Sequence, residues 1–316
     1  MTTPLSTRLS RLADELSESG LPRGSDPTAF DLVVEEADQA LRPPIHERRA
    51  PSSGSILNPT SDSARWSDVT GLTIIRTAVV GQSLREARRF ADGLSSWLLR
   101  GRGGENEWLM FDRPAGSERD LVVLAYALDT TLVQRHPSGT VRIVGAFGVL
   151  RTEGFDWQFE PPVDVLLEAV ADRKAAHRAA TKALLEFAVH DLGARGIGGL
   201  LVLCANPIEG SAAEERLTPP PALRIGTPFH LAPLRHALSQ IDGAAVFDHD
   251  GTLRQLGIRL VPSLAAEDRV DPIGGTRHTS ARRYSYDDPA AVVIVISEDG
   301  PVTVFREGKI IGSSAH

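Results

Sequence analysis

The sequence has one cysteine and no long hydrophobic run. Cys204 lies in the apolar run GLLVLCA, so it is expected to be a buried core thiol, and a disulfide within the chain is excluded. No apolar run approaches the roughly 18 to 20 residues needed to span a bilayer. The segment MTTPLSTRLSRLADELSESG also lacks the hydrophobic core of a signal peptide. We therefore expect a cytoplasmic protein without membrane contact.

An excess of positive charge is also lacking. The chain carries 34 lysines and arginines against 41 acidic residues, a formal net charge of -7. Proteins that coat nucleic acid use a broad positive field, so this balance excludes that class and leaves room only for a local basic pocket. We expect no nucleic-acid partner.

The periodicity of the chain predicts two α/β domains. Leucines spaced at three or four predict a helical segment over residues 1–48, and the Pro-, Ser- and Asn-rich residues 49–67 are typical of a linker. Alternating patterns over 68–162 predict a small α/β domain, in which SLREARRFADGLSSWLLR (83–100) is expected to be a helix. Two consecutive prolines then mark a boundary, and 163–316 form the second domain.

The second domain shows the stronger sheet pattern. The run AAVVIVI is apolar at every position, which predicts a central strand buried on both faces. GIGGLLVLCA, GAAVF and TLRQLGIRLV predict further strands, and helical patterns lie between them. The fold class is therefore α/β, with a central mixed β-sheet flanked by helices in the C-terminal domain and a smaller α/β domain before it.

The segment GGTRHTSARR, which begins at Gly274, has the features of an anion-binding helix start. Two glycines allow close backbone approach, Thr276 is a good N-cap, and the first amides of a helix carry partial positive charge. Arg277 adds a forked donor that suits phosphate oxygens, and His278 adds another donor. An ordinary capped helix with a surface arginine explains the isolated segment equally well.

Two acidic segments could supply carboxylates. Asp242 follows a predicted helix and precedes the strand GAAVF, where it could hold a divalent cation or accept a proton from a hydroxyl. The small Gly243 and Ala244 leave room for a base or ribose. SED, at 297–299, ends the AAVVIVI strand and offers hard oxygen ligands for Mg²⁺ or Mn²⁺. Taken singly, each segment is more often a polar turn.

The order of these segments resembles a known enzyme family. GIGGLLVL, IDGAAVFDHDGTLRQLGIRLVP, GGTRHTSA and AVVIVISEDGPVTVFREGKI are similar to the catalytic domain of the diadenylate cyclases, first associated with the bacterial DNA-integrity scanning protein. The resemblance spans roughly residues 165 to 311. It implies an enzyme that condenses two ATP into cyclic di-AMP with Mg²⁺ or Mn²⁺. It also implies self-association, because the site forms between two facing cyclase domains.

The resemblance assigns a role to individual residues. Catalytic roles fall to Asp242, Arg277 and His278. The positions expected to bind ATP are Gly243, Ala244, Leu260, Gly275, Thr276, Thr279, Ser280 and Ser297. The expected metal ligands are Asp242, Glu298 and Asp299.

Two departures from the family pattern leave an alternative open. Many members read RHR where this chain has Thr279 in the third position, and many have glutamate where it has Asp299. Arg282 and Arg283 lie one helical turn further on, where they could replace the missing cation or simply face solvent. The alternative is a weak or inactive cyclase-like module that binds nucleotide. By its position, the 68–162 domain is expected to sense a signal or control pairing of the cyclase domains.

Overall fold

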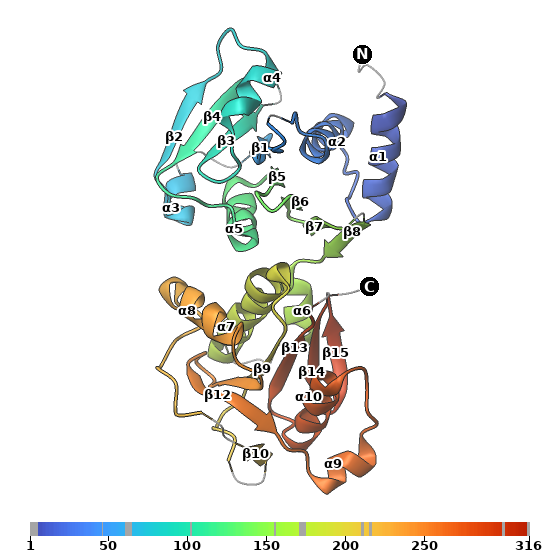
Figure 1. Cartoon of the computed structure of the whole chain (residues 1–316), viewed down its shortest axis with the longest axis vertical. Helices are drawn as coiled ribbons and strands as arrows, with labels where there is room; N and C mark the ends of the chain where they lie inside the picture. Colours follow the sequence, from blue (N-terminus) through green and yellow to red (C-terminus); the bar gives the residue numbers. More distant parts are fainter. Residues whose placement is uncertain are drawn as a thin grey trace. The chain divides into compact units, whose positions relative to one another are not determined.

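The computed structural model describes residues 6–45, 47–60, 65–101, 103–154, 156–170, 175–209, 212–214, 217–298 and 301–314. The chain divides into two compact units, Met1–Pro162 and Val163–His316. Each contains one mixed β-sheet (Figure 1). Across the described ranges, every helix is too short or too polar to cross a lipid bilayer.

The described part of the first unit is built on an eight-stranded sheet. Its strand order is β2-β4-β3-β1-β5-β6-β7-β8, and β1 runs parallel to β3 while the other neighbours are antiparallel. The strands are β1 Ser53–Leu57, β2 Ile74–Ala78, β3 Ser96–Arg100, β4 Asn106–Phe111, β5 Thr131–Arg135, β6 Val141–Gly145, β7 Gly148–Glu153 and β8 Asp156–Glu160.

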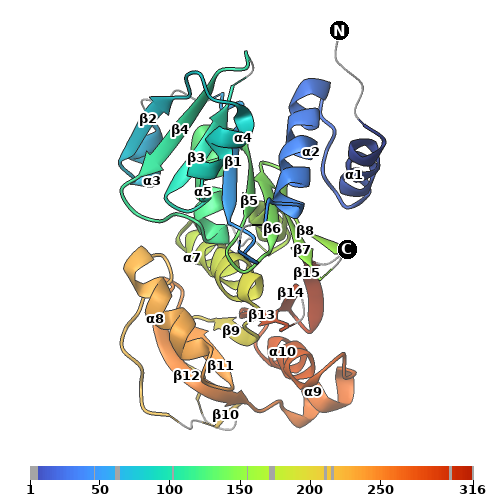
Figure 2. The ribbon, with the colours of Figure 1, turned by 45° about the horizontal axis from the view of Figure 1, so that its top comes forward.

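Helices cover both faces of this sheet. They are α1 Thr7–Glu18, α2 Pro27–Leu41, α3 Trp66–Thr70, α4 Leu84–Ala87, α5 Glu118–Leu128 and the 3-10 turn η2 Arg88–Phe90. Ile56 and Leu132 pack with α5, whereas their neighbours Leu57 and Val133 pack with α1 and α2. This alternation follows from the two-residue period of a strand. Figure 2 shows α2 beside β1 and the β5–β6 region.

Two expectations for this unit are corrected. Residues 49–67 are not a linker throughout, because β1 lies inside the sheet and pairs with β3 and β5. A single helix was expected over 83–100, but the helical part ends at Phe90 and the last five residues form β3. The Asp92 carboxylate accepts hydrogen bonds from the amides of residues 94, 95 and 96. Gly93 has a φ of +70°, and a Cβ there would lie 2.4 Å from the Ser53 carbonyl oxygen. This turn ends the helix and lets the chain reverse against β1.

The second unit contains the sheet order β10-β12-β11-β9-β13-β14-β15 among its described residues. Its strands are β9 Gly199–Leu203, β10 Ala213–Glu214, β11 Ala244–Phe247, β12 Leu253–Leu260, β13 Val292–Ile296, β14 Val302–Arg306 and β15 Lys309–Ser313. Its helices are α6 Val163–Val170, α7 Ala175–Glu186, the π-helix η3 Phe187–Leu192, the 3-10 turn η4 Gly193–Arg195, α8 Pro228–Leu238, α9 Leu264–Arg269 and α10 Thr276–Asp287. A mixed sheet flanked by helices is what the sequence predicts.

The core of this unit lies on both faces of the sheet. Residues of α6, α7, η3 and α8 pack on one face, and α10 packs on the other. Every residue of β13 is buried, and the strand lies between β9 and β14. The prediction that AAVVIVI forms an interior strand is confirmed, because a strand covered on both faces has no polar side.

A buried carboxylate ties the α2 helix to the first sheet. Glu36 accepts hydrogen bonds from Ser55 Oγ at 2.7 Å, Arg88 Nη2 at 2.6 Å and Arg100 Nη1 at 2.6 Å. Burial alone raises its pKa. The hydrogen bond and charge of Arg88, the charge of Arg100 and the Ser55 hydroxyl outweigh this effect, so the pKa of Glu36 lies below its usual value of 4.5.

Glu36→Gln is expected to lower the free energy of unfolding at neutral pH by about 3 kcal/mol, because it removes the buried charge that pairs with two partly buried arginines. A carboxyl with a lowered pKa stabilises the native state above pH 4.5, and this contribution is lost as the pH falls through the native value. The difference between the two proteins should therefore shrink in acid. Urea unfolding of the full chain across the pH range measures it.

The matched control is Glu107→Gln in the more exposed pair with Arg76, which should cost under about 1 kcal/mol. An equal acid dependence in Glu36→Gln and the unaltered protein would show that Glu36 does not provide this stability.

Candidate functional site

The sheet topology of the second unit brings three loop segments to one edge. β9 and β11 run parallel with Leu200 opposite Ala244, so the residues before both strands reach the same edge. β13 runs antiparallel to β9 with Ile296 opposite Gly199, so the residues after β13 reach that edge as well. The chain segments around 198, 242 and 298 therefore converge although they are far apart in sequence.

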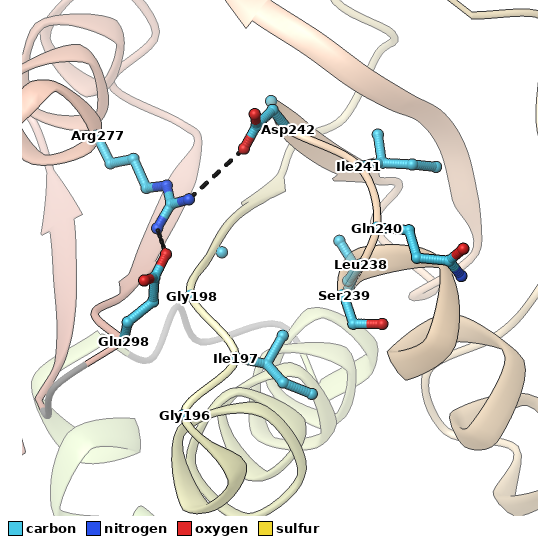
Figure 3. A pocket seen from close by; sticks show the side chains of 12 residues that line it. Gly196, Ile197, Gly198, Leu238, Ser239, Gln240, Ile241, Asp242, Arg277 and Glu298 are labelled. Carbon is cyan, nitrogen blue, oxygen red and sulfur yellow. Dashed lines mark hydrogen bonds and ion pairs between the residues drawn. The ribbon is translucent and has the colours of Figure 1, made fainter.

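Arg277 lies between two carboxylates at this edge (Figure 3). It belongs to the first turn of α10. Its Nη1 donates to Glu298 Oε1 at 3.3 Å, and its Nη2 lies 3.7 Å from Asp242 Oδ1. The side chains of Arg277, Glu298 and Asp242 are 40%, 64% and 100% exposed. Pairs this exposed contribute under about 1 kcal/mol each, so a ligand can replace either one.

A glycine before β9 makes room for the guanidinium. A Cβ on Gly198 would lie 2.4 Å from Arg277 Nη1 and 2.8 Å from Glu298 Cγ. Gly243 meets a different constraint, because it has a φ of +106° and a Cβ there would lie 2.7 Å from the carbonyl carbon of Gly257. Sequence reasoning treated Gly198 only as the start of a strand. The three glycines in ARGIGG are the sequence signal for a backbone that another group, here the Arg277 guanidinium, approaches closely.

These groups line an open cavity of about 390 Å³. Its other walls are the loop from Gly196 to Gly199 and the segment from Leu238 at the end of α8 to Gly243 (Figure 3). One arginine and two carboxylates thus face a space large enough for a small molecule.

Only some of the predicted site residues line this cavity. Those that line the cavity are Asp242, Gly243, Arg277 and Glu298. Gly275, Thr276, Ser280 and Ser297 lie at the neighbouring start of α10 and end of β13 but not among the lining residues. Ala244 and Leu260 are buried in the core, with 0% and 5% of their surface exposed. Asp299 lies outside the described residues.

The start of α10 differs in detail from the expectation. Gly275 holds the N-cap position and Thr276 is the first helical residue, so no side chain caps the helix. His278 follows, partly buried and edge-on to the ring of Phe305 at 6.0 Å between centroids. Burial lowers the pKa of His278, which favours the neutral imidazole at neutral pH. Its ring does not line the cavity.

Thr279, which departs from the family pattern, braces the loop before α10. Its Oγ1 donates to the Ile273 carbonyl oxygen at 3.0 Å and accepts from the Ile273 amide at 3.2 Å. Arg282 donates to the carbonyls of Gly308 and Asp271, and Arg283 donates to the carbonyl of Val270. Both arginines hold backbone segments, so they neither face solvent freely nor reach the cavity.

The carboxylates of this cavity supply some, but not all, of the ligands that a metal ion needs. Within the described ranges, no three acidic, histidine or cysteine side chains form a cluster that could hold an ion. Asp242 and Glu298 both lie near the Arg277 guanidinium, so both could contact a metal ion bound at the same place. Mg²⁺ is commonly held by one or two carboxylates together with substrate phosphates. The site therefore suits a divalent ion that arrives with a polyphosphate.

Thr279→Val is expected to free the loop before α10, since it leaves both polar groups of Ile273 without the hydroxyl. A hydrogen bond of this kind contributes about 1 kcal/mol, so the Ile273 amide should exchange its hydrogen several-fold faster. Hydrogen exchange followed by mass spectrometry or NMR measures the rate. Thr279→Ser keeps the hydroxyl and serves as the control. Equal exchange rates in the valine and serine variants would contradict the bracing role.

Comparison with known proteins identifies two domains in the chain. Residues 186–310 match the family model described as the DisA bacterial checkpoint controller nucleotide-binding domain, and residues 10–160 match the model described as probable sensor domain DACNK. No curated protein matches the chain. A crystal structure of a hypothetical membrane spanning protein from Bacillus cereus is 22% identical over 45% of this chain and 72% of its own, with a TM-score of 0.32, which is too low to support an argument. The chain therefore contains a nucleotide-binding domain of the DAC type at residues 186–310, preceded by a domain of the DACNK type at residues 10–160.

Proposed function

We propose that the chain is a diadenylate cyclase that converts two ATP into cyclic di-AMP and two pyrophosphates. The observation that carries the proposal is the convergence of Asp242, Arg277 and Glu298 on one cavity within a domain of the DAC family. A base, a phosphate-binding cation and a pair of metal-binding carboxylates are the groups that nucleotidyl transfer needs.

The reaction consists of two nucleophilic substitutions, one at the α-phosphorus of each ATP. Each 3′-hydroxyl forms a bond to the α-phosphorus of the other ATP, and the bond from that phosphorus to the oxygen bridging to the β-phosphate breaks. Pyrophosphate leaves with the electron pair. Asp242 accepts the hydroxyl proton, and its full exposure leaves it accessible to a bound ribose. Arg277 and the first amides of α10 stabilise the charge that develops on the phosphate.

Arg277 pairs first with two carboxylates and then with the triphosphate. Without nucleotide it neutralises Glu298 and Asp242. When a triphosphate enters, the guanidinium turns to the phosphate oxygens and frees the carboxylates. Mg²⁺ or Mn²⁺, if bound here, would neutralise phosphate charge and lower the pKa of the attacking hydroxyl. Asp242 and Glu298 would hold that ion, together with Asp299 as the sequence predicts.

The ring can close only between two domains. Each nucleotide supplies one hydroxyl and one α-phosphate, so two occupied DAC domains must face each other and the chain must self-associate. We propose that the DACNK domain senses a signal that controls this pairing. Cytoplasmic location and the absence of a nucleic-acid partner remain predictions from composition.

The alternative function is nucleotide binding without turnover. The bracing of Ile273 by Thr279 favours it, because the position where many family members carry an arginine is occupied by a hydroxyl already bonded to the backbone. One cation is then missing from the phosphate side of the site.

Incubation of the purified chain with ATP and Mn²⁺, followed by chromatography and mass spectrometry, should give cyclic di-AMP and pyrophosphate. The rate per chain should rise with protein concentration, because pairing precedes ring closure. Asp242→Asn should slow the reaction by about 10² to 10⁴-fold by removing the base. Asp268→Asn, on the exposed surface of α9, is the control.

ATP binding with no cyclic product would support the alternative module. A rate per chain that does not change with protein concentration would contradict the facing-domain reaction.

Gly198→Ala tests the position of Arg277. The new Cβ would displace the guanidinium, and a misplaced catalytic group costs about 10²-fold in rate. The fold should survive, because the displaced atoms lie at the end of a flexible side chain and Gly198 does not have a left-handed φ. Gly226→Ala is the matched control, since nothing lies within 4 Å of its added Cβ. Full cyclase activity in Gly198→Ala with unchanged thermal stability would show that the observed Arg277 position is not required.

A further inference from the structure

A second cavity, of about 380 Å³, lies in the first unit. It is bounded by the loop between α1 and α2, the first turns of α2, the end of β1, the start of β5 and the β6–β7 turn. Its volume falls at the lower end of the roughly 300 to 1,000 Å³ of small-molecule sites. Nothing in the proposed cyclase reaction uses it.

The inner wall of this cavity is apolar. Leu21, Val33 and Leu57 line it and are buried, with 4%, 6% and 4% of their surface exposed. Phe30 and Phe147 also line it and are partly buried against the same core. Two aromatic rings beside aliphatic side chains suit a flat apolar body.

Asn58 places an unsatisfied polar atom at this apolar wall. Among the described residues, no group forms a hydrogen bond with its Oδ1, which is buried. Asn58 has a φ of +49°, and its amide donates to the Arg100 carbonyl at 2.8 Å. Glycine would adopt this backbone without leaving a polar atom buried. The carboxamide is therefore in excess of what the turn needs, and its soft χ2 torsion lets it meet a donor in the cavity.

The segment that carries Asn58 is held to the neighbouring segment before β5. The Thr130 hydroxyl donates to the Leu57 carbonyl, and the Thr60 hydroxyl donates to the Asp129 carbonyl and carboxylate. Asp129 also has a positive φ, of +46°. These bonds hold two residues with acceptor groups, Asn58 and Asp129, in place beside the cavity before any ligand arrives.

The positive groups near the cavity already have partners. Arg23 lies 2.6 Å from Asp14 through Nη2 and donates to Ser17 through Nε at 3.0 Å. The first amides of α2, from Thr28 and Ala29, donate to the Asp26 carboxylate. The exposed Arg23–Asp14 pair is weak, but the Arg23 guanidinium also lies over the Phe30 ring at 5.6 Å from its centroid. Because the α2 amides are occupied as well, the acceptors Asn58 and Asp129 favour a ligand that donates hydrogen bonds over a phosphate.

We propose that this cavity binds a small planar heteroaromatic molecule, neutral or singly positive and without phosphate, that donates an N–H to Asn58 and packs between Phe30 and Phe147. The site is separate from the proposed cyclase site, so its test does not depend on cyclase activity. If the DACNK domain senses a signal, this chemistry describes the signal.

The test uses adenine, adenosine, nicotinamide and tryptamine as probes and AMP as the phosphate-bearing comparison. Ligand-detected NMR on the full chain measures affinity, and hydrogen exchange locates the site. At least one phosphate-free probe should bind saturably at millimolar concentration and slow exchange at residues 57–60 and 129–131. AMP should bind there no more tightly than adenosine.

Asn58→Gly separates a binding role from a structural one. The variant keeps the positive φ and removes the carboxamide, so affinity should fall roughly tenfold while thermal stability is retained or rises. Asn58→Asp keeps an acceptor and should favour tryptamine over nicotinamide. Glu307→Gly, at a φ of +53° in the second unit, is the matched control and should bind as the unaltered chain does.

Three results would overturn the proposal. They are the absence of saturable binding by all the phosphate-free probes, equal affinity in Asn58→Gly, and tighter binding of AMP than of adenosine with protection of residues 57–60.

Discussion

The parallel pairing of β9 with β11 is the constraint on which the candidate site depends. Parallel neighbours bring their amino ends to one edge, and the antiparallel β13 brings its carboxyl end to the same edge. No local contact between Gly198, Asp242 and Glu298 is needed to gather them, because the strand register does so. Reversing any one of the three strands would separate the glycine loop, the aspartate and the glutamate.

The charges at this edge partly neutralise one another without a ligand, through pairs weak enough for a ligand to replace. Two carboxylates with no cation would repel each other and an incoming polyphosphate. Arg277 reduces this repulsion from its place between Asp242 and Glu298, and its exposure keeps each pair weak. Gly198 permits this central position, since any larger residue would occupy the space of the guanidinium.

Features that depend on local pattern could be predicted from the sequence. The wholly apolar AAVVIVI indicated an interior strand, and the motif residues at 242, 277 and 298 do line one cavity. Features fixed by distant contacts could not. β1 is short and begins with Ser-Gly-Ser, so its strand character comes from pairing with β3 and β5. The helix expected over 83–100 follows the right period, but the Asp92 side chain bonds three amides and stops it.

Thr279 shows why a family pattern alone gives an incomplete account of a site. Many related sequences have an arginine at this position, so the threonine alone suggests that a phosphate contact has been lost. In this chain its hydroxyl joins both polar groups of Ile273 and sets the approach to α10, where no side chain caps the helix. An arginine at 279 would bring a cation toward the phosphates and break this brace at the same time. A charge at 279 and the loop that leads to Arg277 are therefore coupled, and we expect the proposed activity to depend on both rather than on residue 279 by itself.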